Sequence, residues 1–116
     1  MSEFVKAAFQ KISIDCDMDA LAANQLRSIF ENIAENDNRH VMVDLTRVNF
    51  MDSSGVGALI FLFKRLSAAG RKLALVEVGG QPADLLSQLQ IDRITPVWLA
   101  TADAIEIDPL FERTEI

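Results

Sequence analysis

Cysteine, histidine and basic residues are scarce in this chain of 116 residues, which contains one cysteine and one histidine. Cys16 alone cannot form an intrachain disulfide, and Cys16 with His40 cannot supply the ligands of a Cys/His zinc site. We therefore expect no metal site and a reducing, cytoplasmic setting. The 17 acidic residues outnumber the 11 basic ones, which are scattered, and the net charge is −6. This balance disfavours nucleic acid as a direct partner.

Long apolar runs are missing as well. The longest, over residues 56–63, is far shorter than the roughly 18 residues that a membrane span needs. The N-terminus lacks the basic and apolar regions of a signal peptide, so we expect no membrane insertion. Half of the residues are apolar, which is sufficient for one packed core, and we expect a single domain over residues 1–116.

The motifs of common enzymes are absent too. Met51 stands where a Gly-x-Ser-x-Gly nucleophile elbow around Ser53 needs glycine, and no Gly-Lys-Ser/Thr sequence forms a P-loop. His40 lies at the far end of a predicted strand, about 17–20 Å from the serine, which disfavours a Ser/His pair. Asp44 has no further acid or histidine nearby to complete an acid/base set, and it more simply ends the strand and anchors the turn. We expect no enzymatic activity and no cofactor.

The apolar pattern predicts an α/β fold in which strands and helices alternate. Residues 4–14 predict one or two half-buried strands, as an antiparallel pair at one edge of the sheet. Either Asp17 or Asp19 can cap the first helix. The predicted elements that follow are a helix that ends in the polar run 35–39, a strand over 41–45, a helix over 53–69 ended by Gly70, a strand over 73–78, a helix over 82–90, a strand over 94–99 and a short helix from residue 101, before a tail that frays after Pro109.

The sequence Asp52-Ser53-Ser54-Gly55 falls between the strand over 41–45 and the helix that follows it. A helix N-terminus has unpaired N–H donors and the positive end of the macrodipole, so a phosphate on a serine there would be stabilised. The motif therefore has two interpretations, a phosphorylation switch and a simple N-cap. Its place after the carboxyl end of a strand, where open α/β sheets carry their functional surface, makes the switch about as well supported as the N-cap.

Two further features of this helix have two interpretations each. Gly55 and Gly57 lie in its first turn, where each costs on the order of 1 kcal/mol relative to alanine. Either the helix start packs closely on a neighbouring strand, or a partner's backbone approaches the serines there. The helix also has more apolar residues, Phe61 among them, than one buried face requires. The surplus belongs either to the core or to a stripe that binds a partner.

Four segments of the chain resemble the STAS domain family, and within it the bacterial anti-sigma factor antagonists. They are the strand over 41–45, the turn over 48–51, the signature Asp52-Ser53-Ser54-Gly55-Val56-Gly57, and Gly70-Arg71-Lys72-Leu73. The resemblance extends over about residues 5–107 and leaves a tail over 108–116. It implies a mixed sheet of four or five strands with about four helices largely on one face.

The resemblance also implies a switch. In phosphorylated members of the family the acceptor directly follows the aspartate, which identifies Ser53 here, with Ser54 as the second choice. The unphosphorylated protein would bind an anti-sigma factor that is also its serine kinase, and so release a sigma factor or another target. A PP2C-type phosphatase would restore the binding form. We expect Asp52, Ser54, Gly55 and Gly57 to support the switch, and we expect the partner to contact Asp17, Met18, Asp52, Ser53, Ser54, Val56 and Phe61.

An alternative within the same family is an accessory subunit of a membrane transport complex of the ABC type, which would use the same helix as a permanent interface. The chain departs from the family in one loop: it reads Asp15-Cys16-Asp17-Met18-Asp19, where members usually carry glycine ahead of a Leu-Asp pair. This acidic loop commonly joins the partner surface, so it bears on which partner is bound. We expect a monomer or a weak dimer.

Overall fold

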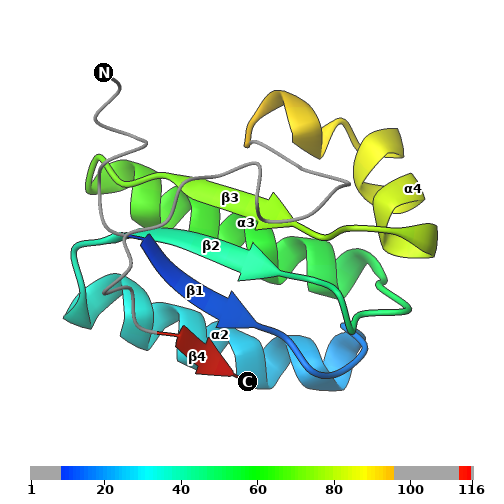
Figure 1. Cartoon of the computed structure of the whole chain (residues 1–116), viewed down its shortest axis with the longest axis horizontal. Helices are drawn as coiled ribbons and strands as arrows, with labels where there is room; N and C mark the ends of the chain where they lie inside the picture. The colour runs from blue at the N-terminus through cyan, green and yellow to red at the C-terminus, as the bar shows by residue number, and fades with distance from the viewer. Residues whose placement is uncertain (1–8, 96–112, 116) are drawn as a thin grey trace.

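The computed structural model describes residues 9–95 and 113–115, which form an α/β structure with an open sheet (Figure 1). The sheet has the strand order β3-β2-β1-β4, and every neighbouring pair is parallel. Parallel strands need crossover connections, and helices supply them here. The strands are β1 (Phe9–Ser13), β2 (His40–Asp44), β3 (Leu73–Val76) and β4 (Arg113–Glu115).

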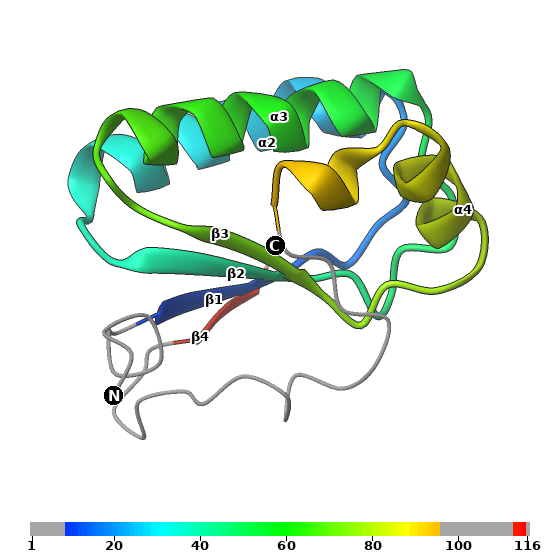
Figure 2. The same ribbon diagram turned by 90° about the horizontal axis from the view of Figure 1, so that it is seen from above.

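The helices cover one face of this sheet. Figure 2 shows α2 (Ala20–Asn36) and α3 (Ser53–Ala68) above the strands, with α2 behind α3, and the two helices pack against each other. The shorter helix α4 (Gly80–Gln88) lies on the same side, beyond the end of β3, and the 3-10 helix η1 (Ile91–Arg93) lies on that side next to β3. Within residues 9–95 and 113–115, no helix combines the length and the apolar character needed to cross a bilayer.

The core lies between the helix pair and the sheet. Leu26 and Phe30 from α2 and Leu62 and Leu66 from α3 are at most 1% exposed. Burying one such side chain contributes about 1.5–3 kcal/mol, so this layer supplies much of the driving force for folding. The strands meet the helices with buried aliphatic side chains that share one cluster with them: Ile12, Val41, Val43, Leu73 and Leu75.

The α/β fold class with helices on one face is confirmed, and so are the two long helices and the strands after them. The placement of the first strand at an edge is wrong. β1 lies between β2 and β4, because residues 113–115 of the tail, which we expected to fray, pair with residues 11–13 of β1. Residues 4–8, which would complete an antiparallel pair with β1, lie outside the described part.

Two other boundaries differ from the prediction. β3 ends at Val76 rather than at residue 78, because Glu77 has a φ of 61°, a left-handed conformation that cannot continue a strand. The strand expected over 94–99 does not begin where predicted, since Ile94 and Thr95 form a turn after η1. Residues 96–99 and the helix expected from residue 101 lie outside the described residues.

The Gly70-Arg71 pair, from the fourth segment that resembles the STAS family, has a structural role at the opposite end of the sheet from the start of α3. Gly70, with a φ of 72°, ends α3 as predicted. Arg71 is 6% exposed, and its guanidinium donates hydrogen bonds to the carbonyl oxygens of Ile33, Ala34 and Arg39. It thereby satisfies carbonyls at the C-terminal end of α2 that the helix cannot pair internally.

Candidate functional site

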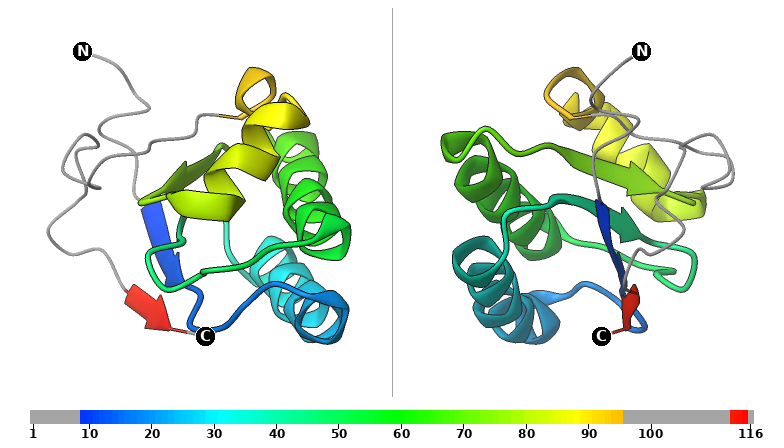
Figure 3. Two further views of the ribbon diagram at one scale, coloured as in Figure 1. Left: turned by 90° about the vertical axis from the view of Figure 1, so that its right-hand side faces the viewer. Right: turned by 60° about the vertical axis from the view of Figure 1, so that its left-hand side comes forward.

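The candidate site is the start of α3, at the carboxyl ends of the strands. Figure 3 (left) looks onto this end of the molecule, where α2, α3 and α4 all begin. Asp52 is the N-cap of α3, and its Oδ1 accepts hydrogen bonds from the N–H groups of Ser54 (2.9 Å) and Gly55 (3.2 Å). Ser53 is exposed and Ser54 is half-buried. A carboxylate therefore caps the helix, and the cap does not use the Ser53 hydroxyl.

Residues 50–52, which lead into α3, are held like a strand inside a sheet. On one side, Met18 donates to the Phe50 oxygen (2.9 Å) and accepts from the Asp52 N–H (3.2 Å). On the other side, the side-chain amide of Gln81 accepts from the Met51 N–H and donates to the Met51 oxygen, both at 2.8 Å. The Phe50 N–H donates to Asp17 and the Asp52 oxygen accepts from the Val56 N–H of α3. Every main-chain N–H and C=O of residues 50–52 thus has a partner.

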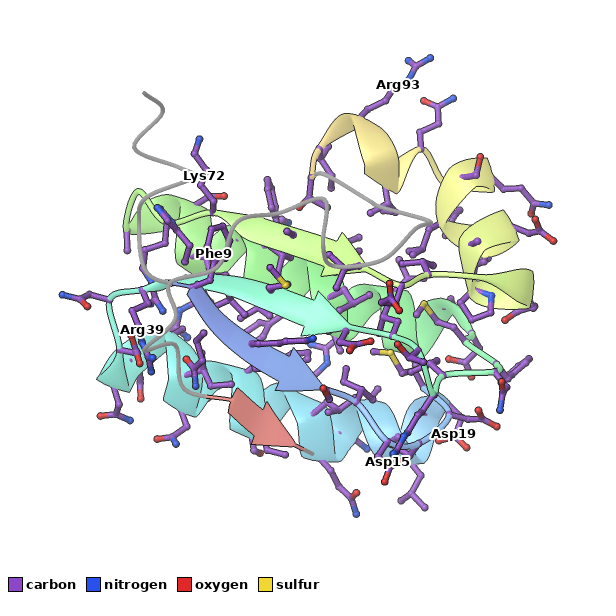
Figure 4. All side chains as sticks on the ribbon, viewed as in Figure 1. Phe9, Asp15, Asp19, Arg39, Lys72 and Arg93 are labelled. Atoms are coloured by element: carbon purple, nitrogen blue, oxygen red, sulfur yellow. The ribbon has the colours of Figure 1, made fainter. Side chains whose placement is uncertain are left out.

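The acidic loop before α2 is explained by its own hydrogen bonds. Asp19 caps α2 through the Ala22 N–H (3.0 Å). Asp17 instead accepts from the N–H groups of Asn49 and Phe50 (3.1 and 3.2 Å), and so ties this loop to the one before α3. Asp15 forms an exposed ion pair with Arg47 at 3.2 Å. Figure 4 shows Asp15 and Asp19 close together at this end of the molecule.

The two glycines of the first turn have different neighbours. A Cβ on Gly55 would lie 2.5 Å from the Met18 oxygen and 2.7 Å from the Met18 Cβ, which no side chain tolerates. Close packing therefore accounts for Gly55, although the neighbour is the loop before α2 and not a strand. A Cβ on Gly57 would lie 3.0 Å from Nη2 of Arg27, the mobile end of a long side chain. Gly57 thus marks a surface where α3 is covered only by Arg27.

Not all residues predicted to contact a partner reach the surface. Met18 is 0% and Val56 4% exposed, so both lie beneath the surface, and we correct that part of the prediction: they support it from below. Asp17 and Ser53 are exposed, and Asp52 and Ser54 are half-buried.

Phe61 is also half-buried. It packs against the core, and the guanidinium groups of Arg27 and Arg65 each lie over its ring, 5.8 Å from the ring centroid. The apolar surplus of α3 therefore belongs mainly to the core, with Phe61 only partly covered.

Sequence reasoning missed three residues at this end of the molecule. Phe50 is 45% and Leu21 72% exposed, so each leaves a large apolar side chain at the surface near the start of α3. An aromatic residue in a predicted turn was the available signal for Phe50. Gln81 had no local signal, because its partner Met51 is 30 residues away.

The charge of the site is negative, since Asp15, Asp17, Asp19 and Asp52 all lie at this end of the molecule. Cys16 is exposed as a residue, but partial burial raises the pKa of its thiol, and the carboxylates of Asp19, Asp15 and Asp17 raise it further. The higher pKa disfavours the reactive thiolate. Asp44 anchors the turn as predicted, because its Oδ1 accepts from the N–H of Thr46. Among the residues that the structure describes, no group of three or more His, Cys, Asp or Glu side chains is placed to hold a metal ion.

Comparison with known proteins identifies the family. The STAS domain model matches residues 8–104. An anti-sigma F factor antagonist of Paenibacillus polymyxa is 28% identical over 68 residues, 59% of this chain and 58% of that protein, so the chain spans less than two thirds of that relative.

Two solved structures share the fold. A Thermotoga maritima protein proposed to be an anti-sigma factor antagonist superposes with a TM-score of 0.70 at 22% identity, over 78% of this chain and 81% of that one. The anti-sigma factor antagonist SpoIIAA in its unphosphorylated form gives 0.62 at 17% identity, over 82% and 84%. With most of its length matched by the family model, the chain belongs to the STAS domain family.

Proposed function

We propose that this protein is an anti-sigma factor antagonist that binds its partner with the start of α3 and the loop of residues 15–19, and that phosphorylation of Ser53 ends this binding. The observation that carries the proposal is the exposed Ser53 hydroxyl, next to an N-cap that Asp52 alone provides. The names of the P. polymyxa relative and of SpoIIAA support the choice of partner.

The physical basis of the switch is charge. A phosphate adds about −1.5 to −2 at neutral pH. The macrodipole of α3 would stabilise it where it forms. The same charge would stand beside Asp52 and near Asp17 in a chain whose net charge is already −6. A partner that covers this surface would have to desolvate it, so the phosphorylated form should bind weakly. Ser54, being half-buried, is the second choice as acceptor.

The partners follow from this assignment. The anti-sigma factor acts as both binding partner and serine kinase, and its capture releases a sigma factor or another target. A PP2C-type phosphatase restores the unphosphorylated form. In this function the protein is a regulator and not an enzyme; it works in the cytoplasm as a monomer or weak dimer, without a cofactor and without direct contact with nucleic acid.

The acceptor is tested by incubating the chain with its cognate kinase and ATP and locating the phosphate by mass spectrometry. Wild type and Ser54→Ala should be modified, and Ser53→Ala should not. Phosphate on Ser54 of the wild type would contradict the assignment.

The direction of the switch is tested by partner affinity. Ser53→Ala should bind like wild type, because it loses only an exposed hydroxyl. Ser53→Asp should bind more weakly by about 1–3 kcal/mol, or roughly 5- to 150-fold, as expected when a like charge must be desolvated at an interface. Equal affinity of wild type, Ser53→Ala and phosphorylated protein would reject the switch and favour a constitutive role such as a subunit of a transport complex.

A further inference from the structure

Gln81 links helix α4 to the segment that carries the acceptor serine. Its side-chain amide forms two hydrogen bonds of 2.8 Å with the N–H and the oxygen of Met51, which is 0% exposed. The pairing imitates that of a neighbouring strand, since one planar amide meets the donor and the acceptor of a single residue. Met51 precedes the N-cap Asp52 directly, so its position determines where α3 and Ser53 begin.

We propose that Gln81 is a positioning residue of the switch: it holds residues 50–52 in place from the side opposite Met18 and couples the position of α4 to that of Ser53. The inference rests on the proposed function for its biological meaning. The coupling itself is a property of the isolated chain and can be measured there.

The conformation of the loop before Gln81 directs this residue toward Met51. Glu77 and Gly80 both have left-handed backbone conformations, with φ of 61° and 58°. No heavy atom lies within 4 Å of a Cβ built on Gly80, so glycine is needed there for its conformation and not for space. A strained residue at the end of β3 and a glycine directly before Gln81 turn the chain so that the first turn of α4 faces Met51.

Helix α4 depends on this contact at its start. The N-cap, Gly79, makes no side-chain capping hydrogen bond. Among the residues of α4, Pro82 and Leu86 are buried and the rest are half-buried or exposed. With only nine residues the helix is too short to be stable by itself, so its first turn relies on this contact and on the burial of Pro82. A change in the position of residues 50–52, such as partner binding would cause, should therefore change the position of the first turn of α4.

The test is NMR of the full chain carrying Gln81→Glu, with Gln88→Glu as the matched control. Both residues are exposed and both substitutions place the same charge on α4, but Gln81 pairs with Met51 whereas Gln88 belongs to the last turn. The carboxylate introduced at position 81 can accept from the Met51 N–H but cannot donate to the Met51 oxygen. We expect the amide signals of residues 51–54 and of the first turn of α4 to shift together. Exchange of the Met51 amide should be roughly 2- to 10-fold faster than in the control, because the pair loses its hydrogen bond to the Met51 oxygen and is weakened by about that much.

Acidification separates positioning from a general loss of structure. A protonated carboxyl at position 81 regains a donor, so the signals of residues 51–54 should return toward those of wild type as this group is protonated. Gln81→Met, which keeps the length of the side chain and removes both hydrogen bonds, should show the same shifts at neutral pH with no return.

Shifts confined to α4 in both position-81 variants, with residues 51–54 matching the control, would overturn the proposal. So would shifts at residues 51–54 that acid does not reverse in Gln81→Glu. Neither result depends on a partner. Failure of Ser53 phosphorylation in the wild type would reject the proposed function and leave the coupling intact.

Discussion

Gly55 and Gly57 lie two residues apart in α3, and their surroundings predict opposite effects of the same substitution. Gly55→Ala would place a Cβ 2.5 Å from a main-chain oxygen, so the loop before α2 must move. We expect the free energy of unfolding to fall by about 1–3 kcal/mol, as in other cases of overpacking. Urea denaturation monitored by circular dichroism measures the change.

Gly57→Ala is the matched comparison. The new Cβ meets only the end of the Arg27 side chain, which can shift, while alanine favours the helix by up to about 1 kcal/mol. We expect this variant to be as stable as wild type or more stable. If Gly57→Ala is as destabilising as Gly55→Ala, the assignment of Gly55 to packing against Met18 fails.

At this scale, the sequence predicts residues whose role is local and misses those whose role depends on distant contacts. The helix start and the exposed serine follow from a strand, a cap and a helical pattern within a few residues. The burial of Met18 and Val56 and the role of Gln81 depend on contacts between segments about 30 residues apart, which no local pattern encodes.

Among the elements, helix α2 owes its C-terminal end to Arg71. We expect Arg71→Lys to lower the free energy of unfolding by about 1–3 kcal/mol, because a single ammonium cannot reach all three carbonyl oxygens and leaves a buried acceptor unpaired. Arg47→Lys is the control, since Arg47 forms an exposed ion pair with Asp15, and we expect a change within about 0.5 kcal/mol. Equal effects of the two substitutions in urea denaturation would contradict this role.

The starts of β2 and β3 are joined through His40, whose Nδ1 accepts from the Lys72 N–H at 2.8 Å. Burial, then the charges of Lys72 and Arg71, lower the pKa of His40 below its ordinary value of 6.5. Since the unfolded chain binds this proton more readily, stability contributed here is present above about pH 6.5 and is lost as the pH falls toward the lower pKa of the folded state.

A second loss is expected at lower pH. The side chain of Arg39 hydrogen-bonds Asp37 and lowers the pKa of that carboxyl from 3.8 to about 2, so its contribution is lost as the pH falls through that range. Urea denaturation between pH 8 and pH 3 should show unfolding free energy decreasing on acidification. In the His40→Gln variant, the free energy of unfolding should depend less steeply on pH near pH 6. A rise in stability between pH 7 and pH 5 in the wild type would contradict the assignment.

Periodicity predicts the elements but not their order in the sheet. The helical spacing in α2 and α3 and the apolar run of β2 are local signals, and all three elements were found where expected. The interior place of β1 results from β4, which joins it from the other end of the chain. The sequence of β1 alternates like that of an edge strand because Lys11 and Ser13 are polar. In the structure both residues are half-buried, and Lys11 forms an ion pair with Asp44 on the neighbouring strand.

For the molecule as a whole, we expect the proposed kinase to require the folded protein. A synthetic peptide of residues 47–58 contains the acceptor and its neighbours, but adopts the conformation of the native segment in only a small fraction of molecules. Its phosphorylation should be slower than that of the whole chain by roughly 10-fold or more, because only that fraction can bind productively. Comparing the two substrates at equal concentration checks this. A peptide that is modified as fast as the protein would show that the kinase recognises a linear sequence and does not require the fold.

The complete pairing of residues 50–52 explains why folding should matter so much. Many enzymes that act on peptides recognise them by adding the substrate as an extra strand, which needs free main-chain groups. Here Met18, Asp17 and Gln81 occupy those groups from both sides. An enzyme that modifies Ser53 would therefore have to recognise a folded surface formed by three separate segments of the chain. The enzyme would then distinguish this protein from other members of its family by the shape of that folded surface. A protein with the same four residues around its serine but a different surface would not be a substrate.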